Sequence, residues 1–590
     1  MTGSPYAVPA IVLITVATLA IGAFGYRISR NTSDFLVASR TVTPRWNASA
    51  ISGEYLSAAS FLGVAGLIMK FGVDMLWYPV GFTAGYLAML LFVAAPLRRS
   101  GAYTLPDFAE ARLRSRRLRK LATGFVVLIG WLYLVPQLHG AGLTLSTVAG
   151  GPSWLGAVIV GVVVTANVAT GGMRSITFVQ AFQYWVKVTA IALPAMVLLV
   201  LWQGRDADDP RIGSLTAPGA PVFPARTTVD VRADVRIVVD VPVVVTAVGT
   251  VDGAGRGGEL ALGAGSHDIG AGAVLTFPAG AAVPRADGVP ALDNANCATP
   301  LVAGAGAGDH PLFATYSLIL ATFLGTMGLP HVLVRFYTNP DGRAARVTTL
   351  VVLCLIGTFY LFPMVYGALG RLYAPQLLLT GKTDAVVLVL PGAMVGGLGG
   401  QLLAGLVAAG AFAAFLSTSS GLLVSVSGVL STDVLGRGSV RDFRRSAMIA
   451  GVVPLVLALQ VGVLDVSQVV GLAFAVAAST FCPLLVLGIW WRGLTPTGAG
   501  AGLIAGGGLS GAAVLMTVLG PALGGWPGAL LAEPAAWTVP VAFAVMVAVS
   551  RLTAARVPAD VGRLMLQLHA PESLRLRRAD PLSRRPEAFR

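Results

Sequence analysis

The sequence predicts an all-α polytopic membrane protein with about 13 transmembrane helices and one small insertion outside the bilayer. Hydrophobic residues make up 55% of its 590 positions, charged residues only 12%, and the mean hydropathy is +0.77. Soluble domains carry about 25% charged residues. Thirteen apolar segments also have lengths close to the roughly 20 residues that cross about 30 Å of hydrocarbon. Both observations place the chain in a membrane along most of its length.

The thirteen segments are residues 6–26, 46–70, 75–97, 121–149, 154–170, 178–202, 312–334, 347–369, 397–430, 446–464, 467–491, 498–519 and 536–553. An odd number of crossings places the termini on opposite sides. The strongly basic loops, such as Arg98–Lys120 and Arg335–Arg346, all fall on one side, and positive loops stay in the cytoplasm. We therefore expect a cell-membrane protein with its N-terminus outside and its C-terminus in the cytoplasm.

Several functional classes are not expected from the composition. The net charge of +14 comes largely from basic residues in short loops without interleaved aromatic residues, so nucleic acid is not an expected partner. Cys297, Cys354 and Cys482 are too few and too scattered for a disulfide framework. No Walker loop, GxSxG, HExxH or CxxC pattern occurs, so no enzyme is expected. The oligomeric state is left open.

A long hydrophilic segment, 203–310, separates two groups of spans. We divide the chain into spans 1–6 (1–202), the insertion (203–310), spans 7–13 (311–553) and a basic cytoplasmic tail (554–590). Within the insertion, apolar and charged residues alternate over most of Thr228–Asp240, which is the period of a β-strand. We expect a small β-rich extracytoplasmic domain, with a disordered linker as the alternative. His267, Asp268 and His310 are weak candidates for metal ligands there.

The second segment, Trp46–Lys70, is the least typical span. It reads WNASAISGEYLSAASFLGVAGLIMK and carries Glu54 in its first half. A carboxylate inside a span costs about 2.5–3.5 kcal/mol on insertion scales, so it should face protein or water. Small residues around Gly53 favour a local unwinding that turns carbonyls toward a bound ion. The alternative is that they only allow close helix packing.

The ninth segment holds the densest hydroxyl cluster of any span. Ala414, Ser417 and Thr418 stand at i, i+3 and i+4, so they share one helix face. One carbonyl and two hydroxyls on that face are oxygens of the kind that a hard cation binds. The carbonyls of Ala48 and Ile51 would add two more if the second segment unwinds, which makes these five residues a candidate Na⁺ site. The alternative is that the hydroxyls only bond back to carbonyls of the preceding turn.

Other polar groups inside spans also require compensation. Lys187 lies near the middle of the sixth span, and Glu54 is its nearest candidate partner by type. His139 and His331 are either hydrogen-bonded within the bundle or part of a proton relay or a site for a substrate carboxylate. Arg335, at the inner boundary, is expected to be an interface anchor.

Several motifs resemble those of the sodium:solute symporter family: SDFLVASR (33–40), GGMRSITFVQ (171–180) and FLSTSSGLLVSVSGVLSTDVL (415–435). More narrowly, SGEYLSAASFLG (52–63), GAYTLPDFAEARL (101–113), LVPQLHGAG (134–142) and GTMGLPHVLVRFYT (325–338) are similar to the branch that moves acetate, propionate, pyruvate and related monocarboxylates. The resemblance implies a LeuT-type core of two inverted five-helix repeats, spans 2–6 and 7–11. It also places the family's central sodium site on Ala48, Ile51, Ala414, Ser417 and Thr418.

The resemblance further implies a secondary active symporter that imports an acetate-like carboxylate on an inward Na⁺ gradient. We expect the substrate against Gly53, Glu54, Tyr55, Ser57, Gln137, His139 and Gln183, and a role in ion or proton coupling for Glu54, Lys187 and His331. Many family members have an acid where this chain has Gln180, so H⁺ is the alternative coupling ion. From other classes, a membrane ligand sensor or receptor and a channel remain open.

Overall fold

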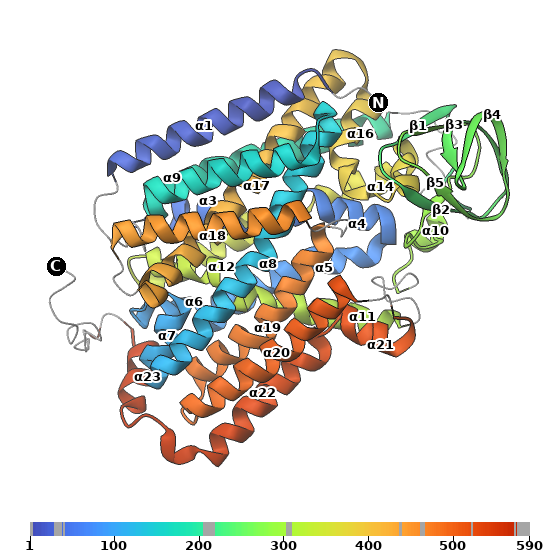
Figure 1. Cartoon of the computed structure of the whole chain (residues 1–590). Helices are drawn as coiled ribbons and strands as arrows, with labels where there is room; N and C mark the ends of the chain where they lie inside the picture. Colours follow the sequence, from blue (N-terminus) through green and yellow to red (C-terminus); the bar gives the residue numbers. More distant parts are fainter. Residues whose placement is uncertain are drawn as a thin grey trace.

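The structure is a computed structural model that describes residues 4–28, 38, 42–204, 219–301, 310–435, 439–460, 466–520, 523–571 and 574. A bundle of long helices carries a small β-sheet at one end (Figure 1). The motif at 33–40 lies outside the described residues apart from Ala38. So do 205–218 and 302–309 of the predicted insertion, and most of the tail beyond residue 571.

The helices before the sheet are α1 (Ala7–Ile28), α3 (Pro44–Tyr55), the π-helix η2 (Ala59–Gly63), α4 (Val64–Phe71), the 3-10 helix η3 (Gly72–Leu76), α5 (Trp77–Phe92), α6 (Ala94–Arg99), α7 (Leu105–Leu113), α8 (Arg116–Ala149) and α9 (Ser153–Gln203). Those after it are α10 (Asn294–Cys297), α11 (Pro311–Gly328), α12 (Pro330–Val334), η5 (Arg335–Thr338), α13 (Gly342–Tyr360), α14 (Pro363–Tyr373), α15 (Gln376–Thr380), η6 (Thr383–Ala385), α16 (Val386–Val395), α17 (Gly397–Val429), η7 (Leu430–Val434), α18 (Val440–Gln460), α19 (Val466–Trp490), α20 (Pro496–Leu519), α21 (Gly525–Ala532), α22 (Ala535–Leu552), η8 (Ala554–Arg556) and α23 (Val561–His569).

Ten stretches of the described residues are long and apolar enough to cross a membrane. Two of them combine neighbouring predicted segments. The stretch Ala59–Phe92 joins α4 to α5 through η3, and α9 spans 51 residues. A straight helix of that length would extend about 76 Å, far more than a bilayer, but α9 is interrupted at Gly172, where φ is 59° and ψ is −163°. Helix α18, which corresponds to a predicted span, lies outside the ten stretches.

The first helix of each predicted repeat is broken. In the first repeat, α3 ends at Tyr55 and a non-helical step at Leu56–Ser57 precedes the next helical turn. In the second, the extended residue Leu329 separates α11 from α12. We expected the first break around Gly53, and the structure places it three residues further along the chain, at Leu56. A Cβ at Gly53 would lie 2.3 Å from the Gln180 carbonyl oxygen, so this glycine instead allows α3 to approach α9.

The insertion forms a seven-stranded antiparallel sheet, which confirms the expected β-rich fold. Its strands are β1 (Thr227–Val231), β2 (Val235–Val239), β3 (Val243–Val251), β4 (Ala254–Leu262), β5 (Gly265–Ile269), β6 (Ala273–Phe277) and β7 (Arg285–Ala286). They follow the order β1-β6-β3-β5-β2-β7, with β4 paired to β3. The alternating stretch 228–240 is not one strand but two, β1 and β2. Apolar side chains from alternate positions, such as Ile237 and Leu275, are buried as the core of the sheet.

The segment after the sheet docks on the helix bundle. Arg371 of α14 donates hydrogen bonds to the Leu292 carbonyl oxygen at 2.8 Å and to Asn294 Oδ1 at 3.1 Å. The Leu301 amide donates to Asp74 Oδ1 at 2.7 Å. Buried polar groups of the bundle therefore depend on residues 292–301.

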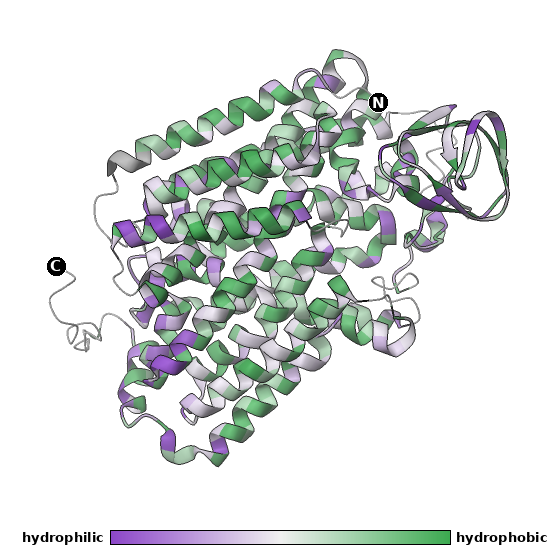
Figure 2. Ribbon diagram, viewed as in Figure 1, coloured by the Kyte–Doolittle hydropathy of each residue, from purple (hydrophilic) through white to green (hydrophobic). Residues whose placement is uncertain are grey.

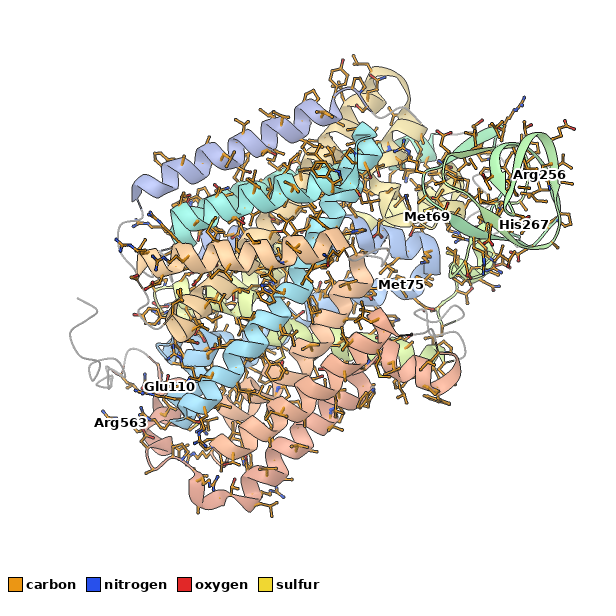
Figure 3. The ribbon with its side chains drawn as sticks, viewed as in Figure 1. Met69, Met75, Glu110, Arg256, His267 and Arg563 are labelled. Carbon is orange, nitrogen blue, oxygen red and sulfur yellow. The ribbon has the colours of Figure 1, made fainter. Side chains whose placement is uncertain are left out.

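The two ends of the bundle differ in polarity. The sheet lies at the end where α1 begins, whereas α7 and α23 lie at the opposite end (Figure 1). Hydrophilic residues gather at the α7–α23 end (Figure 2). Figure 3 places Met69 and Met75 near the sheet, and Glu110 and Arg563 at the far end.

Candidate functional site

The break in the second span exposes backbone carbonyls at the end of α3. The Leu56 amide still bonds to the Ser52 carbonyl, but the last carbonyls of a helix have no partner within it. Side chains supply the partners here. Thr418 Oγ1 of α17 donates to the Glu54 carbonyl oxygen at 2.6 Å. The carbonyls of Gly53 and Leu56 are bound by Lys187, so α17 and α9 both cap the broken helix.

Lys187 is completely buried between these helices, with 0% of its surface exposed. Its Nζ contacts the carbonyl oxygens of Gly53 and Leu56, the latter at 2.7 Å, and Ser417 Oγ at 2.8 Å. Ser417 Oγ in turn donates to the Ala414 carbonyl at 3.1 Å. Lys187 therefore connects the broken end of α3 to the hydroxyl cluster of α17.

The ion pair of Glu54 is formed by Arg335, not by the lysine that we expected. Arg335 Nε lies 2.6 Å from Glu54 Oε2, and both side chains are at most 1% exposed. Arg335 is therefore not an interface anchor. Because it follows the break at Leu329 by one short helix, its guanidinium lies in the bundle interior. A buried charge requires such a partner.

Gln180 and Thr177 of α9 complete the environment of Arg335. Arg335 Nη1 donates to Thr177 Oγ1 at 2.8 Å, and Nη2 donates to Gln180 Oε1. The other end of the Gln180 amide, Nε2, donates to the Ser417 carbonyl at 2.7 Å. An amide suits this position because it accepts from one group and donates to another, which a carboxylate cannot do. The network runs without interruption from Glu54 to Lys187.

The five residues predicted to bind Na⁺ occupy two contacting helices. Ala48 and Ile51 lie within the intact part of α3, where carbonyls take part in i to i+4 hydrogen bonds. Ala414, Ser417 and Thr418 lie on the buried face of α17. The carbonyls that the break frees and that reach α9 or α17 belong to Gly53, Glu54 and Leu56.

Three of the predicted substrate residues surround the break. The Ala58 amide donates to Gln137 Oε1 at 2.9 Å, and Tyr133 OH donates to Ser57 Oγ at 3.1 Å. Tyr55 bonds to Thr326 Oγ1 of α11 at 2.8 Å. Gln137 Nε2 is buried without a hydrogen-bond partner among the described residues, so it is available to a ligand. The two broken helices thus meet at this polar site.

Aromatic rings line one side of this site. Tyr55 packs edge-on against Tyr86, with ring centroids 4.7 Å apart, and against Phe82 and Phe474. Such pairs are worth about 0.5–1.5 kcal/mol beyond the area that they bury.

Other candidates from the sequence lie away from the break. Gln183 Nε2 donates to Thr18 Oγ1 of α1 at 2.9 Å, so its amide faces α1. His139 is half-buried, two residues from Gln137 and therefore on another face of α8. His331 packs edge-on against Tyr133, beside a small void lined also by Gly130, Pro330, Leu422 and Ser425. Neither of its ring nitrogens has a hydrogen-bond partner in the described part of the chain.

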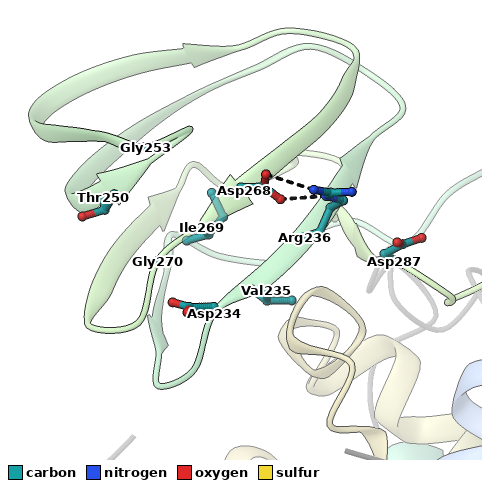
Figure 4. A pocket seen from close by; sticks show the side chains of 9 residues that line it. All are labelled: Asp234, Val235, Arg236, Thr250, Gly253, Asp268, Ile269, Gly270 and Asp287. Atoms are coloured by element: carbon teal, nitrogen blue, oxygen red, sulfur yellow. Dashed lines mark hydrogen bonds and ion pairs between the residues drawn. The ribbon is translucent and has the colours of Figure 1, made fainter. Parts of the chain in front are cut away.

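The weak metal candidates of the insertion are engaged elsewhere. His267 Nδ1 lies 2.8 Å from Asp252, and Asp268 forms a bidentate pair with Arg236 in an open hollow of the sheet (Figure 4). The ring of His310 stacks on Trp526. Within the described residues, no group of three or more His, Cys, Asp or Glu side chains is arranged to hold a metal ion.

Two broken helices that meet at a buried polar site, one in each half of a helix bundle, define the architecture of a secondary transporter. The chain belongs to the sodium:solute symporter family, whose sequence profile matches residues 35–204 and 295–506. The family and fold are those of transporters.

Two relatives extend along most of the chain. A "monocarboxylic acid transporter" of Corynebacterium glutamicum is 30% identical over 567 residues, which cover 90% of this chain and 88% of that protein. An "uncharacterized symporter YwcA" of Bacillus subtilis (strain 168) is 29% identical over 492 residues, covering 82% and 80%.

Solved structures share the fold. A Na⁺-coupled sialic acid symporter in a substrate-bound outward-open state gives a TM-score of 0.59 at 14% identity, covering 92% of this chain and 98% of that one. Mhp1, a nucleobase-cation-symport-1 family transporter, gives 0.50 at 12% identity, covering 90% and 98%. The LeuT-type core that the motifs imply is therefore present.

Proposed function

We propose that this chain is a secondary active symporter that imports a small monocarboxylate on a cation gradient by alternating access. The observation that carries the proposal is the buried site between the two broken helices, which holds two basic side chains, Lys187 and Arg335, and one acid, Glu54. The excess of positive charge suits an anion with a single negative charge. The printed name of the 30% identical relative, a monocarboxylic acid transporter, supports the same substrate class.

The substrate docks beside the break in α3, where Ser57 and Gln137 offer polar atoms and Tyr55 and its aromatic neighbours restrict the space. Transport follows when one set of helices rocks against the other around this fixed site. Coupling requires that cation and substrate both favour the same conformations.

Sodium is the first candidate for the coupling ion. The family profile and the Na⁺-coupled structural neighbour support it. Its predicted ligands are Ala48, Ile51, Ala414, Ser417 and Thr418, of which the carbonyls of Ala48 and Ile51 would first have to leave their hydrogen bonds within α3. The second candidate is a proton-coupled permease on the same scaffold. The observation in its favour is that a side-chain nitrogen, Lys187 Nζ, already lies against Ser417.

Uptake by the purified full chain in proteoliposomes tests the proposal. Radiolabelled acetate, propionate and pyruvate are offered with the Na⁺ gradient and the pH gradient imposed separately. We expect saturable uptake of at least one carboxylate against its own gradient, driven by one of the two ions. Uptake that equilibrates without accumulation under either gradient would indicate a channel and contradict the proposal.

A further inference from the structure

The three hydrogen bonds of Lys187 bear on the number of protons that its nitrogen carries. Gly53 and Leu56 offer carbonyl oxygens, which only accept. Ser417 has a single hydroxyl hydrogen, which it donates to the Ala414 carbonyl, so toward Lys187 it also accepts. A neutral amine has two hydrogens and an ammonium has three. A neutral amine could donate to both carbonyls and accept from the Ser417 hydroxyl; with Ser417 donating to Ala414 instead, Nζ donates all three hydrogen bonds and is the ammonium.

This ammonium binds carbonyl and hydroxyl oxygens, which are also the ligands expected for a bound Na⁺ ion. Two are carbonyls freed by the break in α3, and the third is Ser417, one of the predicted Na⁺ ligands. The Ser417 hydroxyl has its hydrogen directed to Ala414 and a lone pair directed to Lys187. A Na⁺ ion at Ser417 would have to displace the ammonium or lie beside it, and like charges at that distance repel.

The charge of Lys187 is not neutralised by a carboxylate. Glu54 forms its ion pair with Arg335, and Lys187 forms none in the part of the chain that the structure describes. With all three side chains ionised, the network therefore sums to one positive charge in a buried site. An uncompensated buried charge is costly, and one substrate carboxylate would balance it.

We propose that the Lys187 ammonium is the resident cation of this transporter. It ties the broken end of α3 to α17 in the place of a sodium ion, and it provides the positive charge that the substrate carboxylate neutralises. Its part in transport rests on the proposed function, whereas the exclusion of Na⁺ from Ser417 does not. The coupling cation then does not bind at Ser417.

Thermal unfolding of the purified full chain tests the exclusion of Na⁺ without any transport. At fixed ionic strength and pH, NaCl is exchanged for choline chloride. We expect the Tm of the wild type to change by less than 1 °C, because Ser417 is already occupied. A Na⁺-dependent rise of 3 °C or more that Ser417→Ala abolishes would overturn the proposal.

Uptake with chemical rescue tests the role of the ammonium. Lys187→Ala should lower carboxylate uptake at least tenfold, and n-propylammonium, the fragment that the substitution removes, should restore at least a third of the lost rate. Uncharged 1-propanol should not restore it. The control Lys120→Met, at an exposed lysine of α8, should stay within twofold of the wild type.

The outcomes separate the two proposals. A Tm that does not respond to Na⁺, together with rescue of Lys187→Ala uptake by the amine alone, supports the resident ammonium. Normal uptake by Lys187→Ala, or equal rescue by 1-propanol, overturns it. Absence of carboxylate uptake by the wild type under every gradient would refute the proposed function, and the unfolding experiment would still decide whether Na⁺ binds at Ser417.

Discussion

At the scale of single residues, the site is held together by two basic side chains that each bind three oxygen atoms. Arg335 binds a carboxylate, a hydroxyl and an amide oxygen, and Lys187 binds three neutral oxygens. Arginine offers a planar fork and lysine a compact charge, so the two are not interchangeable. In the proposed function, selectivity for an anion would depend on this division of roles between two cations.

The pair Glu54–Arg335 should be strongly coupled. Arg335→Gln leaves a buried carboxylate without its cation, a change that typically costs about 3–5 kcal/mol. Glu54→Gln leaves the Arg335 guanidinium without its carboxylate and should also reduce stability, and it should abolish most uptake. The double variant should be more stable than the sum of the two single losses predicts, because neither charge then remains alone. Thermal unfolding of all four proteins in detergent measures this, and additive losses would show that the two side chains do not interact.

Gly421 should be essential because of the space that it leaves. A Cβ at this position of α17 would lie 2.0 Å from Glu54 Oε1. Gly421→Ala should therefore displace the carboxylate from Arg335 and reduce uptake at least tenfold. The matched control is Gly357→Ala on α13, where a Cβ meets nothing within 4 Å and alanine favours the helix by about 1 kcal/mol. Equal uptake by the two variants would contradict this role of Gly421.

The sequence identified the polar residues of the site better than their partners. Glu54, Lys187 and Gln180 stand out because polar groups inside spans are rare, and periodicity places Ser417 on a helix face. The basic side chain that pairs with Glu54 is determined by the position of α12 after the break at Leu329. No local sequence pattern predicts that position. Gly421 carried no signal, because a glycine within an apolar helix is equally explained by packing.

At the scale of elements, the candidate site is formed mainly where helices are broken, rather than along their regular parts. The breaks at Leu56–Ser57 and Leu329 free carbonyls and aim side chains inward. The sequence predicted the first break within three residues, since small and hydroxylated residues weaken that helix. The sequence could not assign the break to a particular residue. A glycine that allows a helix to unwind and a glycine that allows a neighbouring helix to approach are indistinguishable in sequence.

A turn of the sheet should respond to pH. The hydrogen bond to Asp252 raises the pKa of His267 above its ordinary 6.5, and the same bond lowers the pKa of Asp252 below 3.8. The contribution of His267 is complete below about pH 6.5 and is lost as the pH rises through its raised pKa. That of Asp252 is complete above about pH 4 and is lost as the pH falls through its lowered pKa.

Protection of the β3–β5 amides against hydrogen exchange, corrected for the intrinsic rate, should therefore be greatest between about pH 4 and 6.5. His267→Asn should flatten this profile, whereas an unchanged profile would show that the pair does not stabilise the turn.

At the scale of the whole molecule, we expect the sheet to be dispensable for transport and its connecting segment, residues 292–301, to be required for stability. Val222 and Ala282 are bridge partners at the base of the sheet, so a short turn can join them. Replacing residues 223–281 with a four-residue Gly/Ser turn should leave uptake within twofold of the wild type. Extending the deletion through residue 301 should lower the Tm, because buried Arg371 loses its acceptors at Leu292 and Asn294. A sensor that recognises ligand through the sheet would instead lose binding in the first variant.

The distribution of charge predicts the orientation of the molecule in the membrane. The sheet and the N-terminal end of α1 lie at one end of the bundle, and α7 and α23 lie at the other (Figure 1), where hydrophilic residues gather (Figure 2). Since positive loops remain in the cytoplasm, we expect the sheet outside the cell. Arg256 and Arg563 are exposed at the two ends, as Figure 3 shows. In a variant without the native cysteines, Arg256→Cys should react with a membrane-impermeant maleimide in intact cells, and Arg563→Cys only after permeabilisation. The reverse labelling pattern would place the sheet in the cytoplasm and contradict this orientation.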